Sequence, residues 1–148
     1  MTDSREIIST RVFSFSRELA FRAWTEPEYL ACWWGPKGFT NTFHEFDLRP
    51  GGHWRFTMHG PNGVNYPNES VFVEIIKNER IVFNHISSHK FQVTATFIGL
   101  EGKTKLIFRM LFETSQECGK LKGLVVPSNE QNFDRLEAEL AKMARHLL

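Results

Sequence analysis

The sequence predicts a single α+β domain in which a strongly curved antiparallel sheet of about seven strands wraps a long C-terminal helix and encloses an apolar pocket. Six strand-like runs between residues 39 and 112 are joined by short turns, and apolar residues recur at helical spacing over 128–148. Aromatic residues make up 14% of the chain. A small core needs fewer than that to close, so this content is the first indication of a pocket.

Size, charge and cysteine content narrow the class of protein. The 148 residues suit one domain, so 1–148 are expected to fold as one unit. The formal charge of +1 provides no field that would attract nucleic acid. Cys32 and Cys118 match no metal or redox spacing, and residues 1–6 are too polar for a signal peptide. We expect a reduced, cytoplasmic protein, a monomer or homodimer without membrane insertion.

The first 36 residues predict a strand and two short helices. Residues 6–13 alternate, with Ile8 and Val12 on one face and Arg11 on the other. Ser16 is the expected N-cap of a helix over 17–24. Thr25 is the expected cap of a second helix, which has Pro27 in its first turn and stops near Gly35.

The middle of the chain predicts an antiparallel meander, because its short connections cannot make the crossovers of a parallel sheet. Alternation gives one face that is apolar and rich in aromatic residues. The expected strands are 39–48, 54–58, 70–76, 81–85, 91–98 and 104–112.

The end of the chain predicts a looser segment followed by a long helix. Residues 114–127 contain Gly119 and Gly123, and the helix is expected over 128–148 with Ser128 or Asn129 as its cap. Its apolar stripe would lie on the aromatic face of the sheet. The stripe consists of Phe133, Leu136, Leu140, Met143 and Leu147.

Four phrases of the sequence carry a family resemblance: Ala23–Glu28, Trp33–Pro36, Phe46–Gly52 and Glu79–Phe83. With the order of elements, they resemble the activator of heat-shock-protein-90 ATPase homologue-like family of the START-like (SRPBCC, helix-grip) superfamily, over about residues 6 to 145. The resemblance implies a helix-grip fold with a cavity between sheet and C-terminal helix. Relatives bind lipids, polyketides, hormones or other apolar molecules, and some are cyclases. Eukaryotic co-chaperones of the family carry an additional N-terminal domain, for which we expect no room in this chain.

The pocket lining is predicted from strand parity, from the helix stripe and from the rigid Trp33–Pro36 turn. Whether Trp33 or Trp34 faces the cavity, or whether both are core, stays open. The predicted lining is Trp33, Trp34, Trp54, Phe56, Phe97, Phe108, Met110, Phe133, Leu136 and Leu140.

Candidate catalytic and metal-binding groups are weaker. Acid–base candidates are Glu69, Glu74, His85 and Tyr66, but the sequence shows no converging set and no Gly-x-Ser-x-Gly nucleophile motif. The spacing of His85 and His89 suits a metal on a helix, whereas here it straddles a hairpin turn. His44, His53 and His59 are expected to be satisfied locally.

The turn after the second run of strand residues is expected to be structural. Asp47 and Arg49 could be polar groups at a pocket rim, but an ion pair at a strand end or an Asp that stabilises the turn explains them as well and is the preferred interpretation. Gly51 and Gly52 are interpreted as residues required by a tight turn. From the candidates of this turn and the acid–base and metal-binding candidates together, we predict no catalytic residues, no metal and no cofactor.

Three functional hypotheses follow. The first is a protein that binds a small apolar or aromatic molecule. The second is a cyclase- or aldolase-like enzyme acting on a polyketide, and the third is a stand-alone regulator of a chaperone in the stress response.

Overall fold

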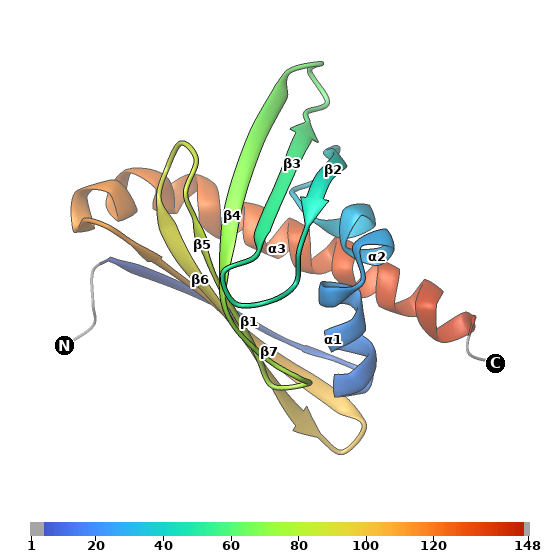
Figure 1. Cartoon of the computed structure of the whole chain (residues 1–148). Coiled ribbons are helices and arrows are strands. Elements are labelled where there is room, and N and C mark those ends of the chain that lie inside the picture. Colours follow the sequence, from blue (N-terminus) through green and yellow to red (C-terminus); the bar gives the residue numbers. More distant parts are fainter. Residues whose placement is uncertain (1–4, 147–148) are drawn as a thin grey trace.

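The computed structural model describes residues 5–146 and confirms the predicted α+β helix-grip fold (Figure 1). Within these residues the chain forms seven strands and three helices. In chain order they are β1 (Glu6–Phe13), α1 (Arg17–Thr25), α2 (Pro27–Trp33), β2 (Thr40–Phe46), β3 (His53–His59), β4 (Asn65–Ile76), β5 (Arg80–His85), β6 (Phe91–Leu100), β7 (Lys103–Phe112) and α3 (Ser115–Arg145).

All seven strands form one antiparallel sheet in the order β1-β7-β6-β5-β4-β3-β2. Register shifts interrupt β2 between Phe43 and Glu45 and β4 between Phe72 and Glu74. Such bulges increase local twist and bend the strand, which favours the curvature of this half of the sheet. The long helix α3 packs along β1 and β7 and against α1 and α2 (Figure 1).

The inner face of the sheet is apolar, as predicted. On β7 the buried side chains alternate with less buried ones, and Leu106, Phe108 and Met110 point toward α3. On β1, Ile8 and Val12 face outward, with 53% and 48% of their surface exposed. The buried residues of β1 occupy the alternate positions: Ile7, Ser9 and Phe13.

Arg11 shares the inner face of β1 and connects that strand to the long helix. Its guanidinium donates to Asp134 Oδ1 at 2.7 Å and to Glu130 Oε1 at 3.0 Å. It also lies over the ring of Phe133, 5.4 Å from the centroid. This charged contact fixes α3 along the edge strand of the sheet.

The two short helices follow the predicted order, with one correction. Ser16 caps α1 and accepts from the Leu19 N–H. Thr25 does not cap α2; it ends α1, and its hydroxyl donates to the Phe21 carbonyl at 2.8 Å. Because a single residue separates the helices, Glu26 occupies the N-cap position of α2, before Pro27.

The long helix begins 13 residues before the predicted start at Ser128, so the prediction of a loose segment over 114–127 was wrong. Thr114 is the N-cap and accepts from the Glu117 N–H at 3.1 Å. Pro127 lies inside the helix, and the neighbouring Ser128 hydroxyl donates to the Leu124 carbonyl. Ser128 and Asn129 are therefore interior helix residues, and Leu147 lies outside the described residues.

Packing explains why the early turns are helical despite glycine and proline. Leu121 and Val125 pack against the core, and Cys118 is buried in it. This burial offsets the low helix propensity of Gly119 and Gly123. The other stripe residues, Phe133, Leu136, Leu140 and Met143, are buried as predicted.

The turn between β2 and β3 has the predicted structural role. Arg49 and Asp47 form an ion pair at 2.8 Å on the surface. Gly51 adopts a φ of +83°, and a Cβ on Gly52 would lie 2.0 Å from the Asp47 carbonyl oxygen. Both positions therefore require glycine for backbone reasons.

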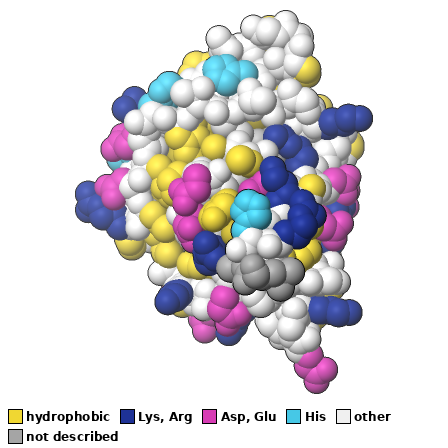
Figure 2. Space-filling view, turned by 90° about the vertical axis from the view of Figure 1, so that its right-hand side faces the viewer, with side chains coloured by type: hydrophobic (Ala, Val, Ile, Leu, Met, Phe, Trp, Pro, Cys, Tyr) yellow, Lys and Arg dark blue, Asp and Glu magenta, His cyan; other side chains and the backbone are white. Residues whose placement is uncertain are grey.

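The surface shows no dominant charge on the side of the molecule that carries α1, α2 and the end of α3. Lysine and arginine side chains lie there among acidic ones and among hydrophobic side chains (Figure 2). Among residues 5–146, no helix is long and apolar enough to cross a membrane.

Candidate functional site

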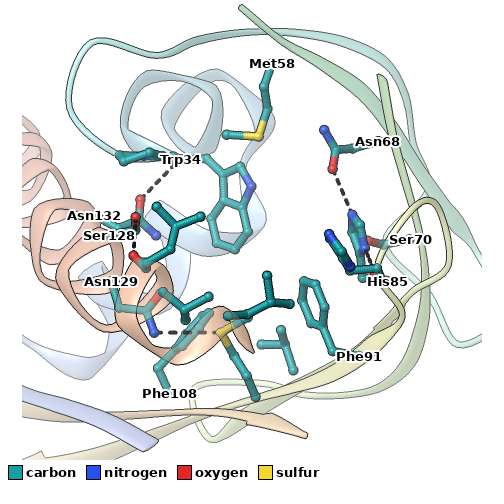
Figure 3. Close-up of a pocket in the computed structure, with 18 of the residues that line it drawn as sticks. Trp34, Met58, Asn68, Ser70, His85, Phe91, Phe108, Ser128, Asn129 and Asn132 are labelled. Carbon is teal, nitrogen blue, oxygen red and sulfur yellow. Dashed lines mark hydrogen bonds between the residues drawn. The ribbon is translucent and has the colours of Figure 1, made fainter. Parts of the chain in front are cut away.

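A cavity of about 300 Å³ lies between the sheet and α3 (Figure 3). Strands β3 to β7, the segment after α2 and the middle of α3 contribute its walls. The strands bring residues from positions 56 to 112 together because successive antiparallel neighbours present alternate side chains to one face.

Most of the lining is aromatic or aliphatic. Phe108, Met110 and Phe112 of β7 contribute to the lining. Trp34 and Met58 lie across the cavity from Phe108 (Figure 3). The remaining apolar lining consists of Pro36, Phe56, Phe83, Phe91, Val93, Leu121, Leu124 and Val125.

A polar wall, formed by Asn68 and Ser70 of β4 and His85 of β5, interrupts this apolar surface (Figure 3). Ser70 and His85 are directly opposed in the β4–β5 register. The His85 ring stacks on Phe91, with centroids 4.6 Å apart and planes inclined by 11°. This stacking holds the imidazole at the cavity wall.

The protonation of His85 follows from two competing effects. Its Nδ1 lies 2.7 Å from the His89 carbonyl oxygen, which can only accept, and its Nε2 lies 2.8 Å from Asn68 Oδ1. Two acceptors favour the imidazolium, but burial lowers the pKa of His85 and favours the neutral ring. A neutral ring has a single N–H and can donate to only one of these two acceptors. Asn68 Nδ2 donates to the Tyr66 carbonyl at 2.8 Å, which keeps Oδ1 turned toward the imidazole.

The helix side of the cavity carries Ser128, Asn129 and Asn132. Asn132 Oδ1 accepts from the Gly35 N–H at 2.8 Å, and Asn129 Nδ2 donates to Ser9 Oγ at 3.2 Å. These bonds use side chains of α3 to hold β1 and the segment after α2 in place.

Arg135 fixes the same segment from the next turn of α3. Its Nη1 donates to the carbonyls of Gly35 at 2.8 Å and Pro36 at 3.0 Å, and its Nη2 donates to that of Cys32 at 2.9 Å. The planar guanidinium presents its N–H donors in a fixed fork, so one side chain holds several carbonyls of this turn in a defined geometry. The backbone that carries Trp34 is therefore positioned by α3.

Four of the ten predicted lining residues line the cavity: Trp34, Phe56, Phe108 and Met110. The other six are buried in the core outside the lining: Trp33, Trp54, Phe97, Phe133, Leu136 and Leu140. Strand parity identifies the inner face, but other side chains fill most of that face. Trp54, for example, stacks on Phe56 with centroids 4.5 Å apart.

Sequence reasoning named His85 as an acid–base candidate but missed Asn68 and Ser70 beside it and the lining contributed by 121–132 of α3. The sequence does carry a signal for the start of that helix, because Thr114 and Glu117 have the spacing of a capping box. For Ser70 and His85, the signal is that both fall on the inner face once β4 and β5 are paired.

The predicted acid–base candidates do not converge. Glu69 pairs with His53 at 2.7 Å, and Glu74 pairs with Arg80 at 2.6 Å. Tyr66 is 42% exposed, and only His85 of the four candidates reaches the cavity. Among residues 5–146, no group of three histidine, cysteine or acidic side chains could hold a metal ion.

The comparisons with known proteins identify the family. The profile of the family described as "Activator of Hsp90 ATPase homolog 1-like protein" matches residues 14–141. The chain belongs to this family. A search of curated proteins found no match.

Solved structures show the same fold at low sequence identity. A crystal structure of a Nitrosomonas europaea protein has a TM-score of 0.88 at 20% identity, covering 97% of this chain and 98% of that one. A solution structure from Arthrobacter aurescens has a TM-score of 0.88 at 19% identity, covering 96% and 90%. A crystal structure from Chromobacterium violaceum has a TM-score of 0.78 at 24% identity, covering 90% and 95%. At such identities, the likeness of this family member to the three solved structures shows a shared fold alone.

Proposed function

We propose that this family member binds one small apolar or aromatic molecule in the cavity between the sheet and α3. The observation that carries the proposal is the cavity itself, about 300 Å³ with a mainly aromatic and aliphatic lining. Ligand pockets range from about 300 to 1,000 Å³, so this one suits a single small molecule rather than a lipid with two acyl chains.

The rigidity of the lining supports this function. Trp34 touches Trp54 and Phe83, with ring centroids at 5.2 and 6.2 Å. Arg135 and Asn132 hold its backbone. A preformed aromatic wall loses little conformational entropy on binding, and such preorganisation favours affinity.

Naphthalene, an uncharged aromatic molecule of suitable size, provides the test. Quenching of tryptophan fluorescence during a naphthalene titration is expected to saturate, because Trp34 lines the cavity. Val93→Phe, which adds volume to a buried lining residue, should weaken binding at least about tenfold by occupying that space. Val73→Phe, at an exposed position outside the lining, is the matched control and should bind as the wild type does.

Circular dichroism spectra of both variants verify that they fold. Unsaturable quenching in the wild type, or equal affinity in Val93→Phe and the wild type, would contradict the proposal.

An enzymatic function receives less support from the same geometry. Glu69 and Glu74 are paired with basic side chains outside the lining, which leaves His85 and His89 as the titratable groups among the lining residues. Regulation of a chaperone ATPase stays a prediction, which the ATPase rate of that chaperone with and without this protein tests.

A further inference from the structure

The lining lacks the side chains that carry a permanent charge at neutral pH. Among the described residues that form it there is no Asp, Glu, Lys or Arg. His89 is largely exposed and already has a carboxylate partner in Glu117 at 3.2 Å. Burial lowers the pKa of His85, which favours its neutral ring. An ionic ligand would therefore lose its hydration without gaining a counter-ion, which costs far more than burying a neutral polar group.

The lining does offer hydrogen-bond donors without partners. Ser70 is 1% exposed, and its hydroxyl has no partner among the described residues. The indole nitrogen of Trp34 lies on the cavity side of its ring, facing the wall of Asn68, Ser70 and His85, and bonds to none of the residues 5–146 (Figure 3). Trp N–H can only donate, so this position favours an acceptor.

The opposite wall of the cavity carries a serine whose hydroxyl has a hydrogen-bond partner. Ser128 lines it too, but its hydroxyl already donates to the Leu124 carbonyl at 2.8 Å. A buried polar group without a partner destabilises the folded protein, so a ligand that supplies the missing hydrogen bond gains affinity there. Of the four such side-chain atoms among the described residues, Ser70 Oγ is the one that belongs to the cavity lining. Ser70 is thus the unusual serine of the pair.

We propose that the pocket selects an uncharged molecule with an aromatic or aliphatic body and an acceptor oxygen, such as a ketone, which receives hydrogen bonds from Trp34 and Ser70. This selectivity rests on the proposed binding function. It names the ligand class as neutral and oxygen-bearing, in contrast to fatty-acid anions and to pure hydrocarbons.

Three naphthalene derivatives of nearly equal shape separate these classes: 2-acetylnaphthalene, 2-ethylnaphthalene and 2-naphthoate. At pH 7.5 we expect the ketone to bind at least about threefold more tightly than the hydrocarbon, the net contribution of one hydrogen bond. The carboxylate should bind at least about tenfold more weakly than the ketone, because its charge has no partner.

Ser70→Ala should reduce the affinity for the ketone about three- to tenfold and leave that for the hydrocarbon unchanged. Ser14→Ala, at an exposed position outside the lining, is the matched control and should change neither. Trp34→Phe removes the second donor and should likewise narrow the preference for the ketone over the hydrocarbon. The midpoint of urea unfolding of ligand-free Ser70→Ala should not fall, because its hydroxyl has no protein partner to lose.

The results distinguish two kinds of failure. If none of the three compounds binds, the proposed function fails. If they bind but the carboxylate matches the ketone, or if Ser70→Ala and Trp34→Phe both leave the ketone preference intact, the selectivity is wrong and the binding function stands. A fall in the unfolding midpoint of Ser70→Ala would assign its hydroxyl a structural role instead.

Discussion

Replacing Phe108 with alanine tests whether the cavity is open beside this ring. Phe108 is 3% exposed, and on one side it meets Trp24 and Phe133, with ring centroids at 5.8 and 6.2 Å. On the other side it lines the cavity. Trp34, itself a lining residue, is also near, with ring centroids 6.4 Å apart. Part of the ring is therefore packed against protein, and part borders the cavity.

The magnitude follows from this asymmetry. Truncating a fully packed phenylalanine to alanine costs about 3 to 5 kcal/mol, through lost contacts and a new cavity. Because the cavity side of Phe108 contributes few contacts, we expect Phe108→Ala to lower the free energy of unfolding by about 3 kcal/mol, the lower end of that range.

Phe133 supplies the matched comparison. It is 1% exposed, lies outside the lining, and packs edge-to-face on both Phe13 and Phe108 at 6.0 and 6.2 Å. The guanidinium of Arg11 covers its face. With contacts on all these sides, Phe133→Ala is expected to cost about 4 to 5 kcal/mol.

Urea unfolding monitored by tryptophan fluorescence measures both values, because Trp24 lies beside Phe108. Equal m-values for the variants and the wild type would show that the free energies can be compared directly. If Phe108→Ala costs as much as Phe133→Ala or more, the space beside Phe108 is filled by protein, and the pocket as described here is wrong.

Three further changes test the helix and the histidine. Leu136→Asp should lower the free energy of unfolding by at least about 3 kcal/mol, because it buries an unpaired charge. Ala138→Asp, at an exposed position of the same helix, is the control. If the melting temperature of Leu136→Asp equals that of the control, Leu136 does not lie on the buried face of α3. Pro127→Ala should raise the free energy of unfolding by about 1 to 3 kcal/mol by restoring a helix hydrogen bond, and a decrease in the same urea experiment would contradict an interior helical position. Burial lowers the pKa of His85 below the usual value of about 6.5, so the unfolded chain takes up this proton first. Stability should thus be lost as the pH falls below about 6.5 toward the folded-state pKa, and His85→Gln should reduce that loss in unfolding curves recorded at pH 7.5 and 5.5; identical pH slopes would refute a buried neutral His85.

The sheet was predictable because the pattern that specifies each strand, and the turn that follows it, lie within a few neighbouring residues of the sequence. Each strand has its own alternation, and turns as short as Glu101–Gly102 bring consecutive strands side by side as antiparallel partners. The start of α3 was not predictable by the same reasoning, because glycine and proline oppose helix locally while the burial of Leu121 and Val125 favours it. Only the assembled sheet supplies the surface on which those two side chains are buried.

The pocket was harder to predict than the face that contains it. Parity places Phe97 and Phe108 on the same inner face. Which of them borders open space depends on what packs opposite. Phe97 meets Phe21 and Trp24 of α1, at 5.5 and 5.9 Å, so that end of the sheet is closed. A helix that precedes the strand by some 70 positions in sequence decides this, and strand alternation carries no such information.

Adjacent tryptophans show the same limit at single-residue scale. Trp33 ends α2, and its indole N–H donates to the Ala23 carbonyl at 2.9 Å, which turns its ring into the helix pair. Trp34 is the first residue after the helix, on a backbone held by Asn132 and Arg135 from α3. The contacts that assign one ring to the core and the other to the cavity thus come from two different parts of the chain. The indole N–H of Trp33 has a protein acceptor, whereas that of Trp34 has none among residues 5–146 and stays available to a ligand. If Trp33 faced the cavity in place of Trp34, the proposed donor to the ligand would be lost.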